Sequence, residues 1–205
     1  EYVEKQDGSY VSNGDLLLQD LVVGCILNNK PKCKILSEEM KFSYSNDQIS
    51  DSDIFVLDPI DGTENFVSGL PIWGLGYSYY SKSNHIESGI FCPEMKIELI
   101  DGFEQIKTSS RIKGLSSSLK MNELAKANEN DLENRIFGCC MFSMYCVCNG
   151  YIRKFENIKG ANVWDILPGL NIALSRKLDV TVNGKLYTGE MLDPYTKHTF
   201  SISAS

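Results

Sequence analysis

The junction between residues 54–57 (IFVL) and the DPIDGT that follows constrains the fold more than any other part of the sequence. A short, continuous apolar run is typical of a buried strand. Pro59 and Gly62 predict a turn directly after it. Asp58 and Asp61 are three residues apart around this proline. We therefore expect a buried strand that presents two carboxylates at its carboxyl end, with the Ile60 carbonyl between them.

The other segments predict an α/β or α+β domain built in layers. A helix is expected at 15–28, with Asp15 at its start and Leu18, Leu21, Val22 and Cys25 on its apolar face. A second is expected to begin near Trp164 with Pro168 in its first turn, and a third lies within 116–135. Apolar or alternating runs predict further strands at 32–36, 72–82, 86–100, 178–184 and 198–205, with a polar turn at 83–85.

Composition favours one domain over 1–205 that recognises a small ligand. The 27 acidic residues exceed the 20 basic ones, and the basic residues are scattered, which argues against nucleic acid as a partner. No apolar run is long enough to predict a membrane span, and no segment resembles a signal peptide. Four of the seven cysteines cluster at 139–148 without a zinc-site spacing, so core packing in a reducing cytoplasm is favoured over a metal site. Only two histidines occur, which weakens a Ser/His/Asp mechanism.

The acidic residues predict magnesium chemistry. Carboxylate and carbonyl oxygens are the ligands that Mg²⁺ prefers. A pair of such ions about 3.5 to 4 Å apart can bind the attacking and leaving oxygens of a displacement, which requires more acids than DPIDGT provides. Glu38, after the strand at 32–36, and Asp165, in the first turn of a later helix, are the best candidates. Gly62 and Thr63 could bind phosphate through backbone N–H groups, and Thr63 with Glu38 could orient a water.

Simpler interpretations exist for each of these residues. Asp-Pro-x-Asp-Gly is a common turn sequence. Asp165 could complement a helix dipole, Asp15 could be an N-cap, and Glu38 with Glu39 could be a solvated pair. The occurrence of all of them in one chain favours a metal site.

Four ordered motifs give the chain a recognisable pattern. They are KQDGSYVSNGD at 5–15, LSEE at 36–39, VLDPIDGTENF at 56–66 and WDILPG at 164–169. Together they resemble the inositol monophosphatase family. The resemblance implies a layered αβαβα sandwich, a homodimer, a requirement for Mg²⁺ and inhibition by Li⁺. The family has one or two helices before the segment that contains Lys5, and we expect this chain to lack them.

The resemblance also implies roles for individual residues. Glu38, Asp58 and the Ile60 carbonyl would hold one Mg²⁺, and Asp58, Asp61 and Asp165 a second. Lys5 and Asp15 would lie at a third site. Asp61, Gly62, Thr63 and Asp165 would bind substrate, and a metal-activated water would attack phosphorus with help from Glu38, Thr63 and Asp58.

The motifs leave the substrate open. Glu64-Asn65-Phe66 resembles the branch that acts on inositol 1-phosphate, which we place first. Lys5-x-Asp7-Gly8-Ser9 resembles the histidinol phosphatases and the 3'(2'),5'-bisphosphate nucleotidases. The nucleotidases, which act on adenosine 3',5'-bisphosphate, are the alternative. A further alternative is a catalytically idle regulatory homologue, whose signature would be a lost metal ligand, and none is lost here.

Overall fold

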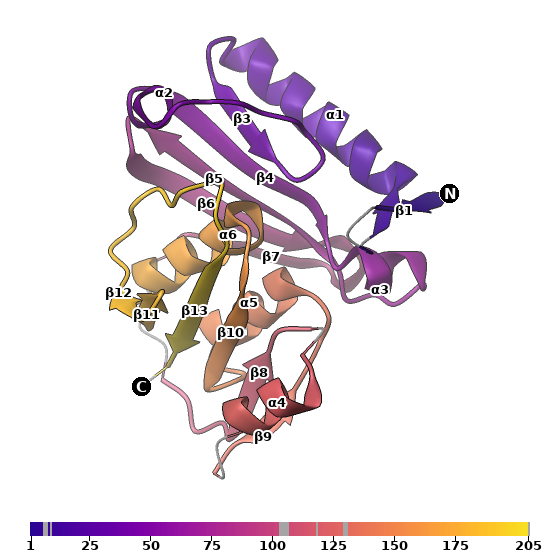
Figure 1. The fold of residues 1–205 in the computed structure, drawn as a ribbon, viewed down its shortest axis with the longest axis vertical. Coiled ribbons are helices and arrows are strands. Elements are labelled where there is room, and N and C mark those ends of the chain that lie inside the picture. Colours follow the sequence, from indigo (N-terminus) through magenta and orange to yellow (C-terminus); the bar gives the residue numbers. More distant parts are fainter. Residues whose placement is uncertain (6–7, 9, 103–106, 118, 129–130, 205) are drawn as a thin grey trace.

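The chain folds into five layers in the order helix, sheet, helices, sheet, helix (Figure 1). The computed structural model describes residues 1–5, 8, 10–102, 107–117, 119–128 and 131–204; Asp7 and Ser9 of the bisphosphate-nucleotidase-like feature lie outside them. The layered αβαβα architecture expected from the sequence is confirmed. Elements outside the two large sheets include the hairpin β1 (Tyr2–Glu4) and β2 (Tyr10–Ser12), the short helix α2 (Asn46–Ser50) and the 3₁₀ turn η1 (Pro93–Met95).

The first large sheet has five strands in the order β3, β4, β5, β6, β7. β3 runs parallel to β4, and the other neighbours are antiparallel. The strands predicted within 72–82 and 86–100 are confirmed. The turn between β5 and β6, however, consists of Lys82 and Ser83, which both have positive φ, as a two-residue hairpin loop requires. Asn84 and His85 therefore belong to a strand and not to the turn. The strands are β3 Lys34–Ser37, β4 Asp53–Asp61, β5 Gly74–Ser81, β6 Asn84–Cys92 and β7 Ile97–Ile100.

Strand β4 continues beyond the end that the sequence predicts. Pro59 lies inside the strand, where pairing with β5 changes register between Asp58 and Asp61. Proline cannot donate a ladder hydrogen bond, and such an irregularity is where a strand tolerates it. The predicted turn at Pro59 is therefore wrong. The chain turns at Gly62, with φ of 83°, and enters the short helix α3 (Thr63–Val67).

Helix α1 (Asn13–Asn29) confirms the predicted helix but not its packed face. Ser12 is the N-cap, and its backbone N–H donates to the Asp15 carboxylate 2.8 Å away. Gln19, one turn later, accepts a 2.8 Å hydrogen bond from Ser37 of β3. These bonds turn Asp15 and Gln19 towards the first sheet. Leu21 is consequently 65% exposed and Cys25 is exposed, so their predicted place on the apolar face is wrong.

The middle layer consists of α5 (Cys140–Cys148) and α6 (Val163–Ser175), which pack between the two sheets and contribute many buried side chains to the main core. Pro168 is the sixth residue of α6, so its predicted place in the first turn is wrong. Its missing N–H removes the partner of the Trp164 carbonyl. The buried ring compensates by packing on β5, where a Cβ on Gly76 would lie 3.1 Å from Pro168 Cγ. The cysteines at 139, 146 and 148 are free and buried, as the core interpretation predicts.

The second large sheet has the strand order β12, β11, β13, β10, β8, β9. The predicted closing strands are confirmed. Among the described residues of 116–135, only those of α4 (Met121–Ala127) are helical, and 133–135 form a strand. α4 covers the outer face of this sheet, where Lys113 Nζ donates to the Ala127 carbonyl at 2.7 Å. The strands are β8 Ile112–Leu115, β9 Glu133–Arg135, β10 Lys154–Ala161, β11 Asp179–Val182, β12 Lys185–Leu186 and β13 His198–Ser203.

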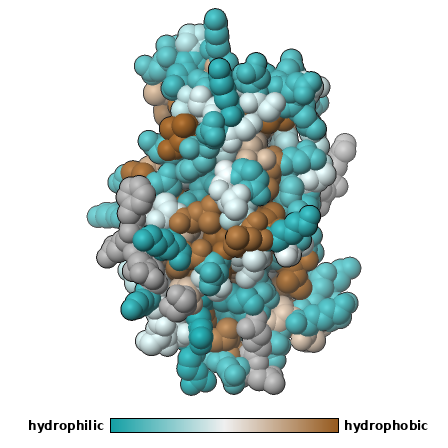
Figure 2. Space-filling view, turned by 90° about the vertical axis from the view of Figure 1, so that its left-hand side faces the viewer, coloured by the Kyte–Doolittle hydropathy of each residue, from teal (hydrophilic) through white to brown (hydrophobic). Residues whose placement is uncertain are grey.

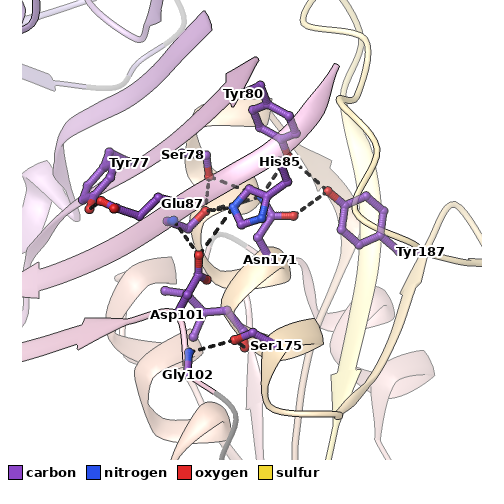
Figure 3. A network of polar contacts seen from close by, with 12 residues as sticks. Tyr77, Ser78, Tyr80, His85, Glu87, Asp101, Gly102, Asn171, Ser175 and Tyr187 are labelled. Atoms are coloured by element: carbon purple, nitrogen blue, oxygen red, sulfur yellow. Dashed lines mark hydrogen bonds and ion pairs between the residues drawn. The ribbon is translucent and has the colours of Figure 1, made fainter. Parts of the chain in front are cut away.

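A buried polar network fixes α6 against the first sheet (Figure 3). The side-chain amide of Asn171 donates to Tyr80 Oη at 2.8 Å, and its carbonyl accepts from Tyr187 Oη at 3.0 Å. Ser78 and Ser88, on neighbouring strands, lie 2.8 Å apart beside it. Buried polar groups that are satisfied in this way specify one packing arrangement. The network therefore holds the orientation of α6, whose first turn carries Asp165.

The face shown in Figure 2 is mostly hydrophilic, with hydrophobic side chains gathered near its middle. None of the helices in the described part of the chain is long and apolar enough to cross a membrane.

Candidate active site

The Asp58 carboxylate is the most unusual group in the structure. The residue is 1% exposed. Among the residues that the structure describes, neither of its carboxylate oxygens has a hydrogen-bond partner. A buried carboxylate without a partner is costly unless it is protonated or beside a cation. Asp58 is thus either protonated or stabilised by a positive charge that the described side chains do not supply.

Glu38 and Asp165 lie beside Asp58, and one ligand atom from each of the three acids lies within 4.8 Å of the others. β3 pairs with β4 in the register Ser37 to Leu57, which brings the residues that follow them together. Asp165 enters from α6, where the Asn162 N–H donates to its Oδ2 at 2.9 Å. The structure therefore brings together three of the predicted metal ligands, from three elements.

Burial and mutual repulsion raise the pKa values of these acids. Desolvation, and then the charge of Asp165, raise the pKa of Glu38 to about 7, although Lys5 opposes the shift. Desolvation and the charge of Asp61 raise the pKa of Asp165 to about 7. Desolvation, followed by the charges of the neighbouring acids, raises the pKa of Asp58 well above its ordinary value. A bound cation would oppose these shifts by stabilising the charged carboxylates.

Asp61 is oriented by residues that the sequence did not identify. Its Oδ2 accepts a hydrogen bond from Cys139 Sγ at 3.0 Å and another from the Met141 backbone N–H. Burial raises the pKa of Asp61 to about 6, although these hydrogen bonds lower it. Neither Cys139 nor the Met141 N–H donates to the other carboxylate oxygen of Asp61, Oδ1. The only signal in the sequence was the position of Cys139 directly after Gly138, at the start of a helix.

The Thr63 hydroxyl lies at the same end of β4. Its Oγ1 is 3.0 Å from the Ile60 carbonyl and 3.4 Å from Asp15 Oδ1. One hydroxyl proton can serve only one of these acceptors at a time. Gly62 has the positive φ that lets the chain turn closely here, and a Cβ would lie 3.1 Å from Cys139 Cβ.

Lys5 and Asp15, which were expected together at a further metal site, contact different side chains from each other. Lys5 Nζ lies 3.0 Å from Glu38 Oε1 and also pairs with Glu39. Burial lowers the pKa of Lys5, but these carboxylates raise it by more, so that its charge is retained. Asp15 is fully buried and serves as the capping partner of Ser12. The interpretation of Asp15 as the N-cap itself is wrong, since that residue is Ser12.

The acids open into a cavity of about 370 Å³, a size typical of sites for small molecules. Its lining includes seven of the predicted site residues, which are Glu38, Asp58, Ile60, Asp61, Gly62, Thr63 and Asp165. Residues of the second sheet form another wall, which carries Ser116, Lys159 and Lys197. A cluster of oxygen ligands in such a cavity fits Mg²⁺. With the ion bound, the site would attract an anion.

A sequence profile described as the inositol monophosphatase family matches residues 1–105 of the chain. The chain is 33% identical to an inositol monophosphatase of Mesembryanthemum crystallinum over 61 residues, which cover 30% of this chain and 23% of that protein. It is 25% identical to inositol monophosphatase 1 of Solanum lycopersicum over 195 residues, which cover 82% of this chain and 70% of that protein. The aligned part thus spans about a quarter of the former relative.

Solved structures share the fold over the whole chain. A structure of an IMPase/NADP phosphatase with Mg²⁺ and phosphate superposes with a TM-score of 0.84 at 19% identity, over 99% of this chain and 81% of that one. An IMPase of Thermotoga maritima superposes with a TM-score of 0.80 at 22% identity, over 99% of this chain and 82% of that one. At these identities the likeness concerns the fold.

Proposed function

Since the chain belongs to the inositol monophosphatase family, we propose that it hydrolyses a phosphate monoester of a small metabolite with Mg²⁺ as its cofactor. The observation that carries the proposal is the position of Asp58, buried without a partner among the described residues and within 4.8 Å of ligand atoms of Glu38 and Asp165. A structural turn would have no use for three clustered acids at the floor of a cavity.

The ligand set follows from the elements that carry the acids. Glu38, Asp58 and the Ile60 carbonyl would hold one Mg²⁺, and Asp58, Asp61 and Asp165 a second. A third ion, near Asp15, remains an expectation. When bound, Mg²⁺ supplies positive charge that stabilises the attacking and leaving oxygens.

The reacting groups come from β3 and from the turn after β4. Glu38, which lies beside Asp58 and Asp165, would accept the proton of the attacking water as a general base. The Thr63 hydroxyl would orient the same water. The backbone N–H groups of Gly62 and Thr63 would bind the phosphate, and Lys5 would hold the Glu38 side chain in place.

Inositol 1-phosphate is the substrate to test first, because relatives named inositol monophosphatase align with most or part of the chain. The Glu64-Asn65-Phe66 segment affects the active site indirectly, through the hydrogen bonds of Asn65. Asn65 Nδ2 donates to the carbonyls of Ile72 and Phe137 at 2.7 and 2.8 Å, so it shapes the loop before Cys139. Bisphosphate nucleotides are the second candidate, favoured by the two lysines of the cavity wall.

The test is phosphate release by the purified protein from inositol 1-phosphate, adenosine 3',5'-bisphosphate, fructose 1,6-bisphosphate and histidinol phosphate, with Mg²⁺ or with chelator. Release from at least one compound, abolished by chelator and inhibited by Li⁺, supports the proposal. If a folded protein releases nothing in saturating Mg²⁺, the idle regulatory homologue becomes the better explanation. Gel filtration in the same buffer tests the expected homodimer.

A further inference from the structure

The segment that carries Glu38 has no regular secondary structure of its own. Residues 38–45, all of them within the described range 10–102, connect β3 to α2 and form neither helix nor strand. Near its start, the Met40 N–H donates to the Ser37 carbonyl at 3.3 Å. Segments outside helices and sheets open more readily than the core. Contacts with other elements therefore decide how firmly Glu38 is held.

The Tyr195 hydroxyl provides one of these contacts. It accepts a hydrogen bond from the Tyr44 N–H and donates one to the Tyr44 carbonyl, both at 2.8 Å. A phenol hydroxyl can do both at once, because it has one proton to donate and lone pairs that accept. Tyr195 thus satisfies the backbone of Tyr44 as a neighbouring strand would, although the two residues are 151 positions apart in the sequence.

Phe42 extends this contact to α6 through an aromatic cluster. Its ring centroid lies 5.6 Å from that of Tyr195 and 6.1 Å from that of Trp164, which it meets at an interplanar angle of 83°. Aromatic pairs at these distances attract one another beyond the area that they bury. Trp164 directly precedes Asp165 in α6. The cluster therefore joins the segment that carries Glu38 to the helical turn that carries Asp165.

The segment between β12 and β13, which presents Tyr195, is anchored at both ends. It extends from the second sheet toward the first (Figure 1). At its start, the Tyr187 hydroxyl donates to Asn171 of α6 at 3.0 Å. At its end, Lys197 packs against a bulge in β10, where a Cβ on Gly160 would lie 3.1 Å from Lys197 Cβ. Tyr195 therefore contacts Tyr44 from a fixed support.

The clustered acids need such support, because carboxylates repel one another. One ligand atom each from Glu38, Asp58 and Asp165 lies within 4.8 Å of the others. Like charges at this separation favour a larger distance between the end of β3 and the start of α6. The contact between Phe42 and Trp164 opposes that movement, because it holds the same two segments together.

We infer that Tyr195 is a positioning residue of the metal site. Through its hydrogen bonds to Tyr44 and its contact with Phe42, it holds the segment after β3 against α6, so that Glu38 and Asp165 stay close together before Mg²⁺ binds. This inference rests on the proposed function, which assigns Mg²⁺ to these acids. It adds a residue that lies outside all four sequence motifs.

The test is the variant Tyr195→Phe, which removes the hydroxyl and keeps the ring beside Phe42. Tyr195 is 54% exposed, so the variant should fold. In calorimetric titrations we expect the dissociation constant for Mg²⁺ to rise about fivefold, which corresponds to the roughly 1 kcal/mol that one hydrogen bond contributes. Turnover should fall at limiting Mg²⁺ and recover at saturating Mg²⁺. Tyr151→Phe, at a tyrosine that is 58% exposed, is the matched control and should bind Mg²⁺ as the wild type does.

Hydrogen exchange separates a positioning role from a merely structural one. In chelator, the amides of residues 39–43 should exchange faster in Tyr195→Phe than in the wild type. Saturating Mg²⁺ should restore their protection, because the coupling between two binding events is reciprocal. Phe42→Leu, which removes the ring contacts and remains apolar, should reproduce both effects. Exchange that rises equally with and without Mg²⁺, at wild-type Mg²⁺ affinity, would show that Tyr195 only stabilises the fold.

Failure of this inference can be distinguished from failure of the proposed function. If the wild type hydrolyses its substrate and Tyr195→Phe binds Mg²⁺ as tightly as the wild type, the positioning role is overturned and the phosphatase proposal stands. If Mg²⁺ binds but no ester is hydrolysed, the phosphatase proposal fails, and the calorimetric comparison still decides the role of Tyr195. A folded wild type that binds no Mg²⁺ overturns both.

Discussion

Cys139 donates its thiol proton to the carboxylate of Asp61, with Sγ 3.0 Å from Oδ2. The Met141 N–H donates to the same oxygen. Together they leave Oδ1 as the oxygen of Asp61 that is available to a metal ion. A residue that orients a ligand in this way contributes to metal affinity without touching the ion.

Replacing Cys139 with alanine should therefore weaken Mg²⁺ activation. We expect the Mg²⁺ concentration for half-maximal activity to rise about tenfold, the lower end of the effect of such orienting residues. Cys139→Ser retains a donor and should lose less. Cys25→Ala, at an exposed cysteine, is the control. An unchanged Mg²⁺ dependence in Cys139→Ala would show that the Met141 N–H alone orients Asp61.

Asn171→Ala should destabilise the fold. The substitution leaves the buried hydroxyls of Tyr80 and Tyr187 without the Asn171 amide (Figure 3). Tyr187 Oη keeps the Glu190 carbonyl as a partner at 3.0 Å, so we expect a loss of about 1 to 3 kcal/mol in the free energy of unfolding, the cost of one unsatisfied buried group. Urea denaturation measures it, with Asn84→Ala on the protein surface as the control. A loss equal to that of the control would mean that water replaces the amide.

Thr63→Ala should lower kcat about 100-fold with little change in KM, if the hydroxyl acts on the water in the transition state. Thr63→Ser retains the hydroxyl and should keep most of the activity. Steady-state kinetics at saturating Mg²⁺ measures both variants. A rise in KM at constant kcat would instead assign Thr63 to substrate binding.

The metal-free protein should become less stable as pH rises. Folding raises the pKa of Glu38 and Asp165 to about 7 and that of Asp61 to about 6, so between about pH 4 and pH 7 the folded state binds more protons than the unfolded state. The free energy of unfolding then falls with increasing pH. Thermal denaturation with chelator should give a higher Tm near pH 5 than near pH 8, and Mg²⁺ should raise Tm most near pH 8. A Tm that rises over this interval in chelator would contradict the raised pKa values.

The convergence of Glu38, Asp58 and Asp165 could be predicted because Glu38 directly follows β3, Asp58 ends the apolar run of β4 and Asp165 lies in the first turn of α6. Parallel pairing of β3 and β4 brings their carboxyl ends together, and the sequence shows both ends. The role of Pro59 could not be predicted, because a local turn signal yields to the register change with β5. The packed face of α1 was mispredicted for a related reason, since a capping box and a hydrogen bond to Ser37 outweigh apolar spacing.

The contacts between distant segments could not be predicted from single motifs. Cys139 is 78 residues from Asp61 in sequence, and cysteine is far more often a packing residue than a hydrogen-bond donor. The approach of Lys197 to Gly160 depends on a bulge that leaves no sequence signal beyond one glycine. The approach of Lys197 to Gly160 follows from the pairing of β10 with β13, which only the assembled sheet defines.

The central claim is that the clustered acids bind Mg²⁺ for phosphate ester hydrolysis, and calorimetric titration of Mg²⁺ into wild type and Asp165→Asn tests it most directly. Asp179→Asn, at an exposed position of β11, is the control. The account predicts that wild type and the control bind Mg²⁺ with release of protons, whereas Asp165→Asn stays folded but binds at least about 10-fold more weakly, with a parallel loss of phosphate release. Equal Mg²⁺ affinity and turnover in all three proteins would contradict it.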